Sequence, residues 1–420
     1  MNYNDIRVCV IGLGYVGLPL FLSFSKHFTT YGFDIDSKRI SELKSYKDIS
    51  GEQELVDAYS AENLSSRPSI LSKANVFIVT VPTPVLENHK PDFKPLISAT
   101  TVISKHITPG SVIIFESTVY PGATEEICIP LLTEGSKLKL NEDIFCGYSP
   151  ERINPGDKTN TIDQITKVVA GSNETTAAFI EFLYSRIIHA GIHIAPSIKV
   201  AEASKIIENV QRDVNIALMN EFSKFCDKMN ISTKDVLNAA ATKWNFINFV
   251  PGLVGGHCIG IDPYYLIEKA ESLNVELPVI KSARLVNEGL PEYVAAKIHF
   301  DIGENRTEKS NKILIFGATF KEDCADTRNS KVFDVASHLN TLGFKVDVFD
   351  PYIKMQAHDL NRANIIENIS DQDYVAVILA VPHREFKEKS VQFYEQFLIS
   401  DGLFFDIKSA VKSSSNIFSL

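Results

Sequence analysis

A glycine-rich turn near the start of the chain constrains the fold more than any other feature of the sequence. The apolar run Arg7–Ile11 ends in Gly12, and residues 12–17 read GLGYVG. An apolar, helix-like stretch follows at residues 18–28, and a second short run occupies residues 30–33. A strand, a glycine turn, a helix and a second strand at this spacing predict a βαβ unit with parallel strands.

The glycines of this turn have separate roles in a dinucleotide site. Gly12 permits the tight turn, Gly14 lets the backbone approach a pyrophosphate, and Gly17 lets the helix pack closely on the strand. Asp34 ends the next strand, where a carboxylate binds the adenosine ribose hydroxyls and repels a 2′-phosphate. The pattern therefore favours NAD over NADP, and Arg39 is the residue that complicates this prediction. FAD uses the same fingerprint and stays open as an alternative.

Strands and helices alternate along the rest of the N-terminal half. Apolar runs at residues 76–81 and Val112–Phe115 end in polar, proline-rich turns, which predicts a doubly wound parallel sheet of the α/β class. A second α/β domain without GxGxxG is expected near the C-terminus. Its expected elements are strands at Lys312–Phe316, Lys345–Phe349, 375–381 and 403–405, and a helix at 330–342.

The middle of the chain changes character at residue 197. Residues 197–228 contain no glycine or proline, and their apolar residues recur at helical spacing. This predicts one helix of roughly 30 residues, about 45 Å long, which suits a domain link or a dimer seam. Further helix-like sequence follows at 233–242 and 279–301, and a polar linker is expected at 303–311. The expected domains are residues 1–196, which bind NAD, residues 197–302, which form a helical centre, and residues 303–420, which form the second α/β domain.

Composition excludes several classes of protein. The net charge of −10 disfavours a nucleic-acid binder, since phosphate binding needs a dense basic surface. No run of 18 apolar residues indicates a membrane span, and the N-terminal sequence enters a strand at once, so we expect a cytoplasmic protein. The six cysteines form no CxxC pair and match no zinc spacing, so free thiols and no metal are expected.

Cys258 is the cysteine with a chemical setting. It lies in the sequence GGHCIGID, just before a helix start at Pro263, where a helix dipole favours a thiolate. Lys205 and Asn209 are four residues apart on the long helix and suit stabilisation of an oxyanion, with Asp213 continuing their line. Taken singly, the cysteine also fits a structural role and the helix positions fit a solvated face. His257 is adjacent to Cys258, and adjacent side chains rarely point together.

Six motifs in order resemble those of the UDP-glucose/GDP-mannose dehydrogenase superfamily, over nearly the whole chain. They are GLGYVGLP at 12–19, ESTV at 116–119, SPER at 149–152, EASKIIEN at 202–209, GGHCIGID at 255–262 and TFKEDCADTRNS at 319–330.

This resemblance implies a fold and a reaction. The implied architecture is an N-terminal NAD domain, a central helical domain that builds a homodimer, and a C-terminal UDP-binding domain, acting on a UDP-sugar. The implied reaction is a four-electron oxidation of sugar C6 with two NAD. The implied NAD contacts are Gly12, Gly14, Tyr15, Val16, Gly17, Asp34, Arg39, Thr83, Thr118 and Arg328.

The resemblance also implies catalytic roles. Cys258 would be the nucleophile, which forms a thiohemiacetal and then a thioester. Lys205 and Asp262 would serve as acid/base or oxyanion-stabilising groups, Asn209 would hold the oxyanion, and Thr118 and Glu151 would position the water. The implied substrate contacts are Glu151, Arg152, Lys205, Asn209, Lys243, Gly255, Phe320, Lys321 and Lys408.

Details of the cysteine loop narrow the choice of sugar substrate. UDP-glucose enzymes often carry a lysine where this chain has Ile261 and a second glutamate where it has Pro155. The loop GGHCIGIDPYYL, with TKWNF upstream, instead resembles enzymes acting on UDP-N-acetylglucosamine or UDP-N-acetylgalactosamine in Vi-type capsule and O-antigen synthesis. Lys243 is the candidate replacement for a cross-subunit arginine, since no arginine lies between Arg212 and Arg284.

Three alternatives to UDP-N-acetylglucosamine and UDP-N-acetylgalactosamine as substrates remain open. UDP-glucose is one, and UDP-N-acetylmannosamine or GDP-mannose is the second. A non-catalytic sensor that binds NAD and a UDP-sugar is the third, against which the presence of Cys258, Lys205, Asn209 and Asp262 argues.

Overall fold

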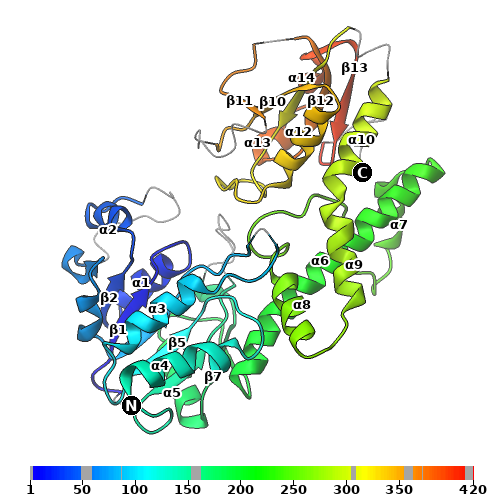
Figure 1. The fold of residues 1–420 in the computed structure, drawn as a ribbon. Coiled ribbons are helices and arrows are strands. Elements are labelled where there is room, and N and C mark those ends of the chain that lie inside the picture. Colours follow the sequence, from blue (N-terminus) through cyan, green and yellow to red (C-terminus); the bar gives the residue numbers. More distant parts are fainter. Residues whose placement is uncertain are drawn as a thin grey trace. The chain divides into compact units, whose positions relative to one another are not determined.

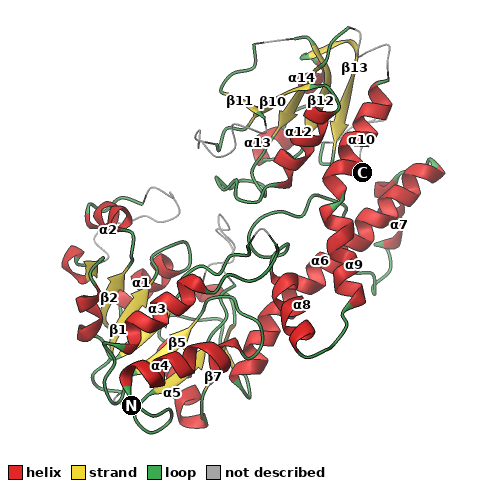
Figure 2. Ribbon diagram, in the orientation of Figure 1, coloured by secondary structure: helices red, strands yellow, loops and turns green. Residues whose placement is uncertain are grey.

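The computed structural model describes residues 3–48, 59–86, 88–152, 162–303, 309–353, 363–370, 372–411 and 420. Pro155 and most of the expected linker lie outside these residues. The chain forms two compact units, Met1–Glu208 with Tyr264–Val275, and Asn209–Pro263 with Glu276–Leu420 (Figure 1). Each unit has its own sheet accompanied by helices (Figure 2).

The first unit is built on an eight-stranded sheet, which confirms the expected α/β class. In spatial order the strands are β3 (Leu64–Ser65), β2 (Thr29–Phe33), β1 (Arg7–Ile11), β4 (Val76–Val79), β5 (Val112–Phe115), β6 (Phe145–Tyr148), β7 (Lys167–Gly171) and β8 (Ile192–Ile194). The pairs are parallel except for β6 and β7, which are antiparallel. The order reverses between β1 and β4, and ligands of such sheets bind at the carboxyl ends beside that point.

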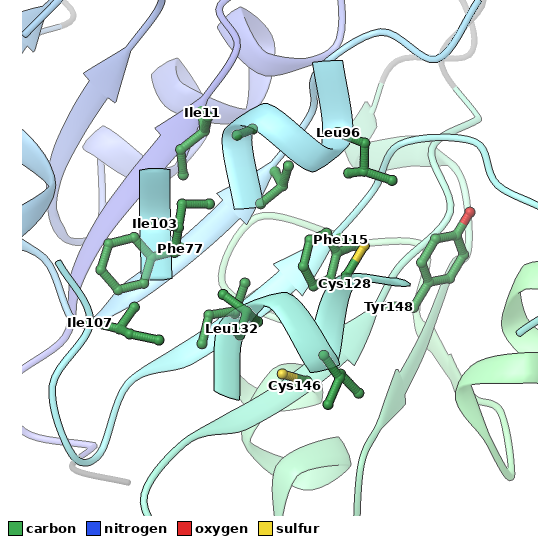
Figure 3. Close-up of a cluster of buried hydrophobic side chains, with 14 of the residues drawn as sticks. Ile11, Phe77, Leu96, Ile103, Ile107, Phe115, Cys128, Leu132, Cys146 and Tyr148 are labelled. Atoms are coloured by element: carbon green, nitrogen blue, oxygen red, sulfur yellow. The ribbon is translucent and has the colours of Figure 1, made fainter. Parts of the chain in front are cut away.

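Alternating side chains of the central strands enter two separate cores. On one face Ile11, Phe77 and Phe115 pack with α3 (Lys94–Ser104) and α4 (Ile129–Ser136), as Figure 3 shows. The residues between them on the same strands enter the other core, with α1 (Gly17–Ser25) and α5 (Glu174–Tyr184). Strands buried on both faces explain why their sequences read as short continuous apolar runs.

The second unit repeats this architecture on a smaller scale. Its strand order is β11 (Asn364–Ile366), β10 (Lys345–Phe349), β9 (Lys312–Phe316), β12 (Tyr374–Leu379) and β13 (Leu398–Asp406), all in parallel pairs. Helices α10 (Leu290–Ile302) and α12 (Lys331–Thr341) pack in one core, while α13 (Arg384–Lys387) and α14 (Val391–Glu395) pack in the other. The reversal of order between β9 and β12 gives this unit a ligand-binding edge of its own.

The expected long helix is present as α6 (Ile198–Met229), 32 residues long. It is followed by α7 (Thr233–Ala240), α8 (Asp262–Ser272) and α9 (Pro278–Glu288). The helix-like stretch 279–301 proves to be two helices, α9 and α10, because Pro291 lacks the N–H that a continuous helix would use and instead lies in the first turn of α10. No helix in the described part of the chain is both long and apolar enough to span a membrane.

Candidate active site

The glycine turn after β1 has the geometry of a dinucleotide cradle. Gly12 has a φ of +91°, and its N–H donates to the carbonyl of Phe33 at 2.8 Å. A Cβ on Gly17 would lie 1.8 Å from the carbonyl oxygen of Gly12, so only glycine allows α1 to start this close to the strand. A Cβ on Gly14 would meet nothing within 4 Å, which leaves the backbone of this exposed residue open to a phosphate.

Asp34 and Arg39 are held against this turn. One carboxylate oxygen of Asp34 accepts from the N–H of Leu13 at 2.7 Å. The Arg39 side chain donates to the carbonyl of Leu13 at 3.0 Å and to the Asp48 carboxylate at 2.8 Å. Because Arg39 is thus engaged by an acid, the arrangement agrees with the expectation that this site takes NAD. Tyr15 and Val16, also expected to contact NAD, are partly exposed in the same turn.

Thr83 and Thr118 come together from the loops that follow β4 and β5. The Thr83 hydroxyl donates to the carbonyl of Thr118 at 2.7 Å. The carbonyl of Thr83 in turn accepts from the Tyr265 hydroxyl of α8 at 2.6 Å. Both threonines therefore lie at the carboxyl edge of the sheet, the edge at which the glycine turn also lies.

Glu151 is part of a buried cluster in the first unit. The ammonium of Lys167 lies 2.7 Å from a carboxylate oxygen of Glu151 and 2.7 Å from one of Glu116. The Tyr184 hydroxyl donates to the other oxygen of Glu116. Burial raises the pKa of Glu116 to about 7, although Lys167 and Tyr184 oppose that rise. Arg152 pairs with Glu208, and its N–H donates to Glu151 at 2.5 Å.

Glu202, on α6, is a further buried carboxylate. Its oxygens accept from the N–H groups of Gly122 at 2.5 Å and Thr124 at 2.9 Å. Burial nevertheless raises its pKa from 4.5 to about 7. The folded state therefore binds more protons than the unfolded chain in this range, so the contribution of Glu202 to the free energy of unfolding falls as the pH rises through it.

We expect the free energy of unfolding of the Glu202→Gln variant to rise relative to that of the wild type as the pH increases from about 4.5 to 7. A pKa shift of this size corresponds to about 3 kcal/mol across the whole range. Thermal unfolding midpoints of both proteins, followed by circular dichroism along a pH series, measure the effect. Curves that stay parallel at all pH values would show that the Glu202 pKa is the same in the folded and unfolded states.

Cys258 differs from the other five cysteines, all of which lie in the described residues. None of the six forms a disulfide, and Cys258 alone is not buried. Its carbonyl accepts from the N–H groups of Ile261 at 3.0 Å and Asp262 at 2.8 Å, so it forms the turn that leads into α8. By contrast, burial raises the pKa of Cys128 to about 12, which keeps that thiol protonated at neutral pH. Exposure therefore singles out the cysteine that the sequence motif identifies.

Asn209 and Asp262 form a buried pair next to this turn. The Asn209 amide donates to a carboxylate oxygen of Asp262 at 2.5 Å, and the two residues are 2% and 1% exposed. Lys205, one helical turn before Asn209, is also buried. The alternative that these positions form a solvated helix face is therefore wrong. Burial of polar groups costs free energy unless they are hydrogen-bonded or paired. A cluster of buried polar side chains is therefore typical of a functional site.

The Cys258 loop packs tightly on the loop that follows β9. The Asn329 amide donates to the carbonyl of Gly256 at 2.9 Å. Gly256 has a φ of +80°, and a Cβ there would lie 2.6 Å from the ring of Phe320. A Cβ on Gly255 would lie 2.6 Å from the carbonyl oxygen of Asn329. These glycines thus bring Cys258 and the expected substrate residue Phe320 into one neighbourhood.

The remaining expected residues of the second unit lie around these loops. His257 packs edge-on against Phe320, and its Nδ1 lies 3.8 Å from Asp326. The Asp326 carboxylate also accepts hydrogen bonds from the backbone N–H and the guanidinium of Arg328. The Lys321 ammonium lies 5.6 Å from the Phe320 ring centre. Lys408 is 3.6 Å from Glu322, and Lys243 is exposed in the loop after α7.

Two charged residues of these buried networks were not identified from the sequence. Lys167 is the first, and its only signal is that a lysine starts the apolar run of β7. Arg284 is the second: it donates to Asp213 at 2.5 Å and also pairs with Glu288. A Cβ on Gly260 would lie 3.7 Å from its guanidinium, which places Arg284 directly behind the Cys258 loop. No group of three His, Cys, Asp or Glu side chains in the described residues could hold a metal ion.

Comparisons with known proteins agree with this arrangement. Three domain models of the UDP-glucose/GDP-mannose dehydrogenase family match: the NAD binding domain at residues 6–188, the central domain at 199–289 and the UDP binding domain at 314–413. The UDP-N-acetyl-D-glucosamine 6-dehydrogenase of Pseudomonas aeruginosa is 46% identical, over 96% of this chain and 97% of that protein. Protein CapL of Staphylococcus aureus is 43% identical, over 98% and 97%. The solved UDP-D-ManNAc dehydrogenase of Pyrococcus horikoshii superposes with a TM-score of 0.87 at 28% identity, covering 99% of both chains.

Proposed function

The chain belongs to the UDP-glucose/GDP-mannose dehydrogenase family, and on that premise we propose that it oxidises C6 of a UDP-N-acetylhexosamine to a carboxylate. It is an NAD-dependent UDP-sugar dehydrogenase. The observation that carries the proposal is Cys258, an accessible thiol in the turn before α8, beside the buried Asn209–Asp262 pair. The product, a UDP-linked uronic acid, is proposed to serve surface polysaccharide synthesis.

Different residues of the site are proposed to serve different steps of the reaction. The turn of Gly12, Gly14 and Gly17 with Asp34 would hold NAD, which would supply the hydride acceptor for each oxidation. The Cys258 thiolate adds to the C6 aldehyde, which keeps it from being released, and a thioester results after the second oxidation. Lys205 and Asn209 are proposed to stabilise the negative oxygen, with Asp262 orienting Asn209.

Hydrolysis of the thioester and binding of the sugar nucleotide use the other residues. Thr118 and Glu151 are proposed to position the water. Contacts with the sugar nucleotide are assigned to Arg152, Lys243, Gly255, Phe320, Lys321 and Lys408, and Arg328 is assigned to NAD. Phe320 and Lys321 follow β9 at the order reversal of the second sheet, where such folds bind ligands.

Two observations favour an acetamido sugar over glucose. The loop GGHCIGIDPYYL carries Ile261 where UDP-glucose enzymes often have lysine. The relatives of Pseudomonas aeruginosa and Salmonella typhi that are 46% and 41% identical are both named UDP-N-acetyl-D-glucosamine 6-dehydrogenase.

A substrate panel tests this proposal. NADH formation is measured with UDP-N-acetylglucosamine, UDP-N-acetylgalactosamine, UDP-glucose and UDP-N-acetylmannosamine, side by side. We expect two NADH per sugar, with kcat/KM highest for one of the first two, which differ only at C4. Preference for UDP-glucose would refute the acetamido assignment, and preference for the mannosamine form would refute the narrower assignment to the glucosamine or galactosamine form. Tight binding without NADH would instead support the sensor alternative.

We further propose three domains, at residues 1–196, 197–302 and 303–420, and a cytoplasmic homodimer. The family models that match end and begin near these borders. Leu218, Phe225 and Met229 share one face of α6, and each is more than half exposed. Apolar side chains gathered on one helix face favour association with a second copy. Sedimentation velocity of the full chain measures its oligomeric state. A monomer would contradict the proposed homodimer.

A further inference from the structure

A lysine that the proposed mechanism does not use lies against Glu151. Lys167 is 4% exposed, and its ammonium makes 2.7 Å contacts with Glu151 and Glu116. A lysine is rarely buried to this degree unless it is paired. Its location is therefore set by these two carboxylates.

The antiparallel pair in the first sheet explains how Lys167 reaches Glu151. Gly147 is opposite Gly171 and Tyr148 is opposite Ala170, so Lys167 falls opposite Glu151 when this register is continued. In a parallel arrangement the first residue of β7 would lie at the far edge of the sheet. The reversed direction of β7 instead places Lys167 at the carboxyl ends of β5 and β6, where Glu116 and Glu151 follow their strands.

We propose that Lys167 is a positioning residue for thioester hydrolysis, in which it fixes the Glu151 carboxylate while Glu116 also binds its ammonium. The inference rests on the proposed role of Glu151 in positioning the water. In that step the water oxygen bonds to the thioester carbon, and the carbon–sulfur bond breaks. The Cys258 thiolate leaves, and the proton from water passes by way of Glu151 to solvent.

The charges of the cluster support separate tasks for its two carboxylates. Two carboxylates face one ammonium, so full ionisation leaves a net negative charge in a buried place, which is costly. The titratable groups that face Glu116 are Lys167, Glu151 and Tyr184. Burial raises the pKa of Glu116 to about 7, so Glu116 carries the extra proton below that pH. Glu151 then keeps the ammonium of Lys167 as its own partner.

The test compares Lys167→Met with Lys167→Arg, using Lys139→Met as the control because Lys139 is exposed. Single-turnover assays with NAD and the UDP-sugar separate the oxidation steps, seen as NADH, from hydrolysis, seen as loss of the Cys258 acyl adduct by mass spectrometry after acid quench. We expect Lys167→Met to slow hydrolysis by about 10-fold to 100-fold, so that the adduct accumulates, with little change in KM. Lys167→Arg should restore most of the rate, and Lys139→Met should match the wild type.

A second variant keeps the inference testable if Lys167→Met does not fold. Glu116→Gln preserves shape and removes the titration, so an inflection near pH 7 in the hydrolysis rate of the wild type should disappear. Hydrolysis unchanged in folded Lys167→Met, or a pH profile unchanged in Glu116→Gln, would overturn the inference. Absence of NADH from wild-type protein with every UDP-sugar would overturn the proposed function instead, and the two failures are thereby distinguished.

Discussion

Replacing Cys258 by alanine should lower turnover to the uronic acid by about 10³-fold or more. The loss is expected because the variant lacks the sulfur that captures the aldehyde, so the second oxidation has no covalent intermediate to act on. Any residual NADH should approach one equivalent per sugar, with the aldehyde as the product. Steady-state NADH formation and product analysis by mass spectrometry measure both effects.

Cys128→Ala is the matched control. Cys128 is buried among the apolar side chains of the first unit (Figure 3), and burial raises its pKa to about 12. This variant should lose some thermal stability, as small cavities in a core do, and keep its kcat. Alkylation of the folded wild type by iodoacetamide should modify Cys258 and spare Cys128. Full turnover by Cys258→Ala would refute the covalent mechanism.

The sequence predicted those parts of the fold that rest on local spacing. Gly12, Gly14, Gly17 and Asp34 fulfil their roles within one βαβ unit, so their relation can be read over about twenty residues. Strands such as β1 and β9, buried on both faces, are apolar after their first basic residue and flanked by turns, which makes their ends clear. The strand pair β6 and β7 was not identified, because glycine interrupts the apolar run of β6 and a lysine and a glycine bound that of β7.

Properties that depend on packing between distant segments could not be predicted. The spacing of Lys205 and Asn209 fits a solvated face as well as a site, and only burial beside Asp262 decides between them. The role of Lys167 depends on the direction of β7, which no residue of that strand encodes. In the sequence, Arg284 is an ordinary cation in a helix. Its role follows only from the contact with Asp213, which is 71 positions away in the chain.

Two glycine variants should separate NAD binding from folding. Gly14→Ala should fold like the wild type, because its Cβ would meet nothing within 4 Å. It should nevertheless raise the Kd for NAD by about 10-fold or more, since the methyl group occupies the space through which the backbone approaches the pyrophosphate. Thermal unfolding without ligand and calorimetric titration with NAD measure the two properties independently.

Gly17→Ala should impair both properties. Its Cβ would lie 1.8 Å from the Gly12 carbonyl oxygen and 2.5 Å from the Thr80 hydroxyl, so α1 must move away from β1. Overpacking against backbone costs about 1–3 kcal/mol of stability, and the displaced helix no longer directs its first N–H groups at a phosphate. If Gly14→Ala bound NAD normally while Gly17→Ala did not, the turn would act only as a packing element. Loss of binding in both variants, with loss of stability in Gly17→Ala alone, would identify Gly14 as the point where the backbone meets the cofactor.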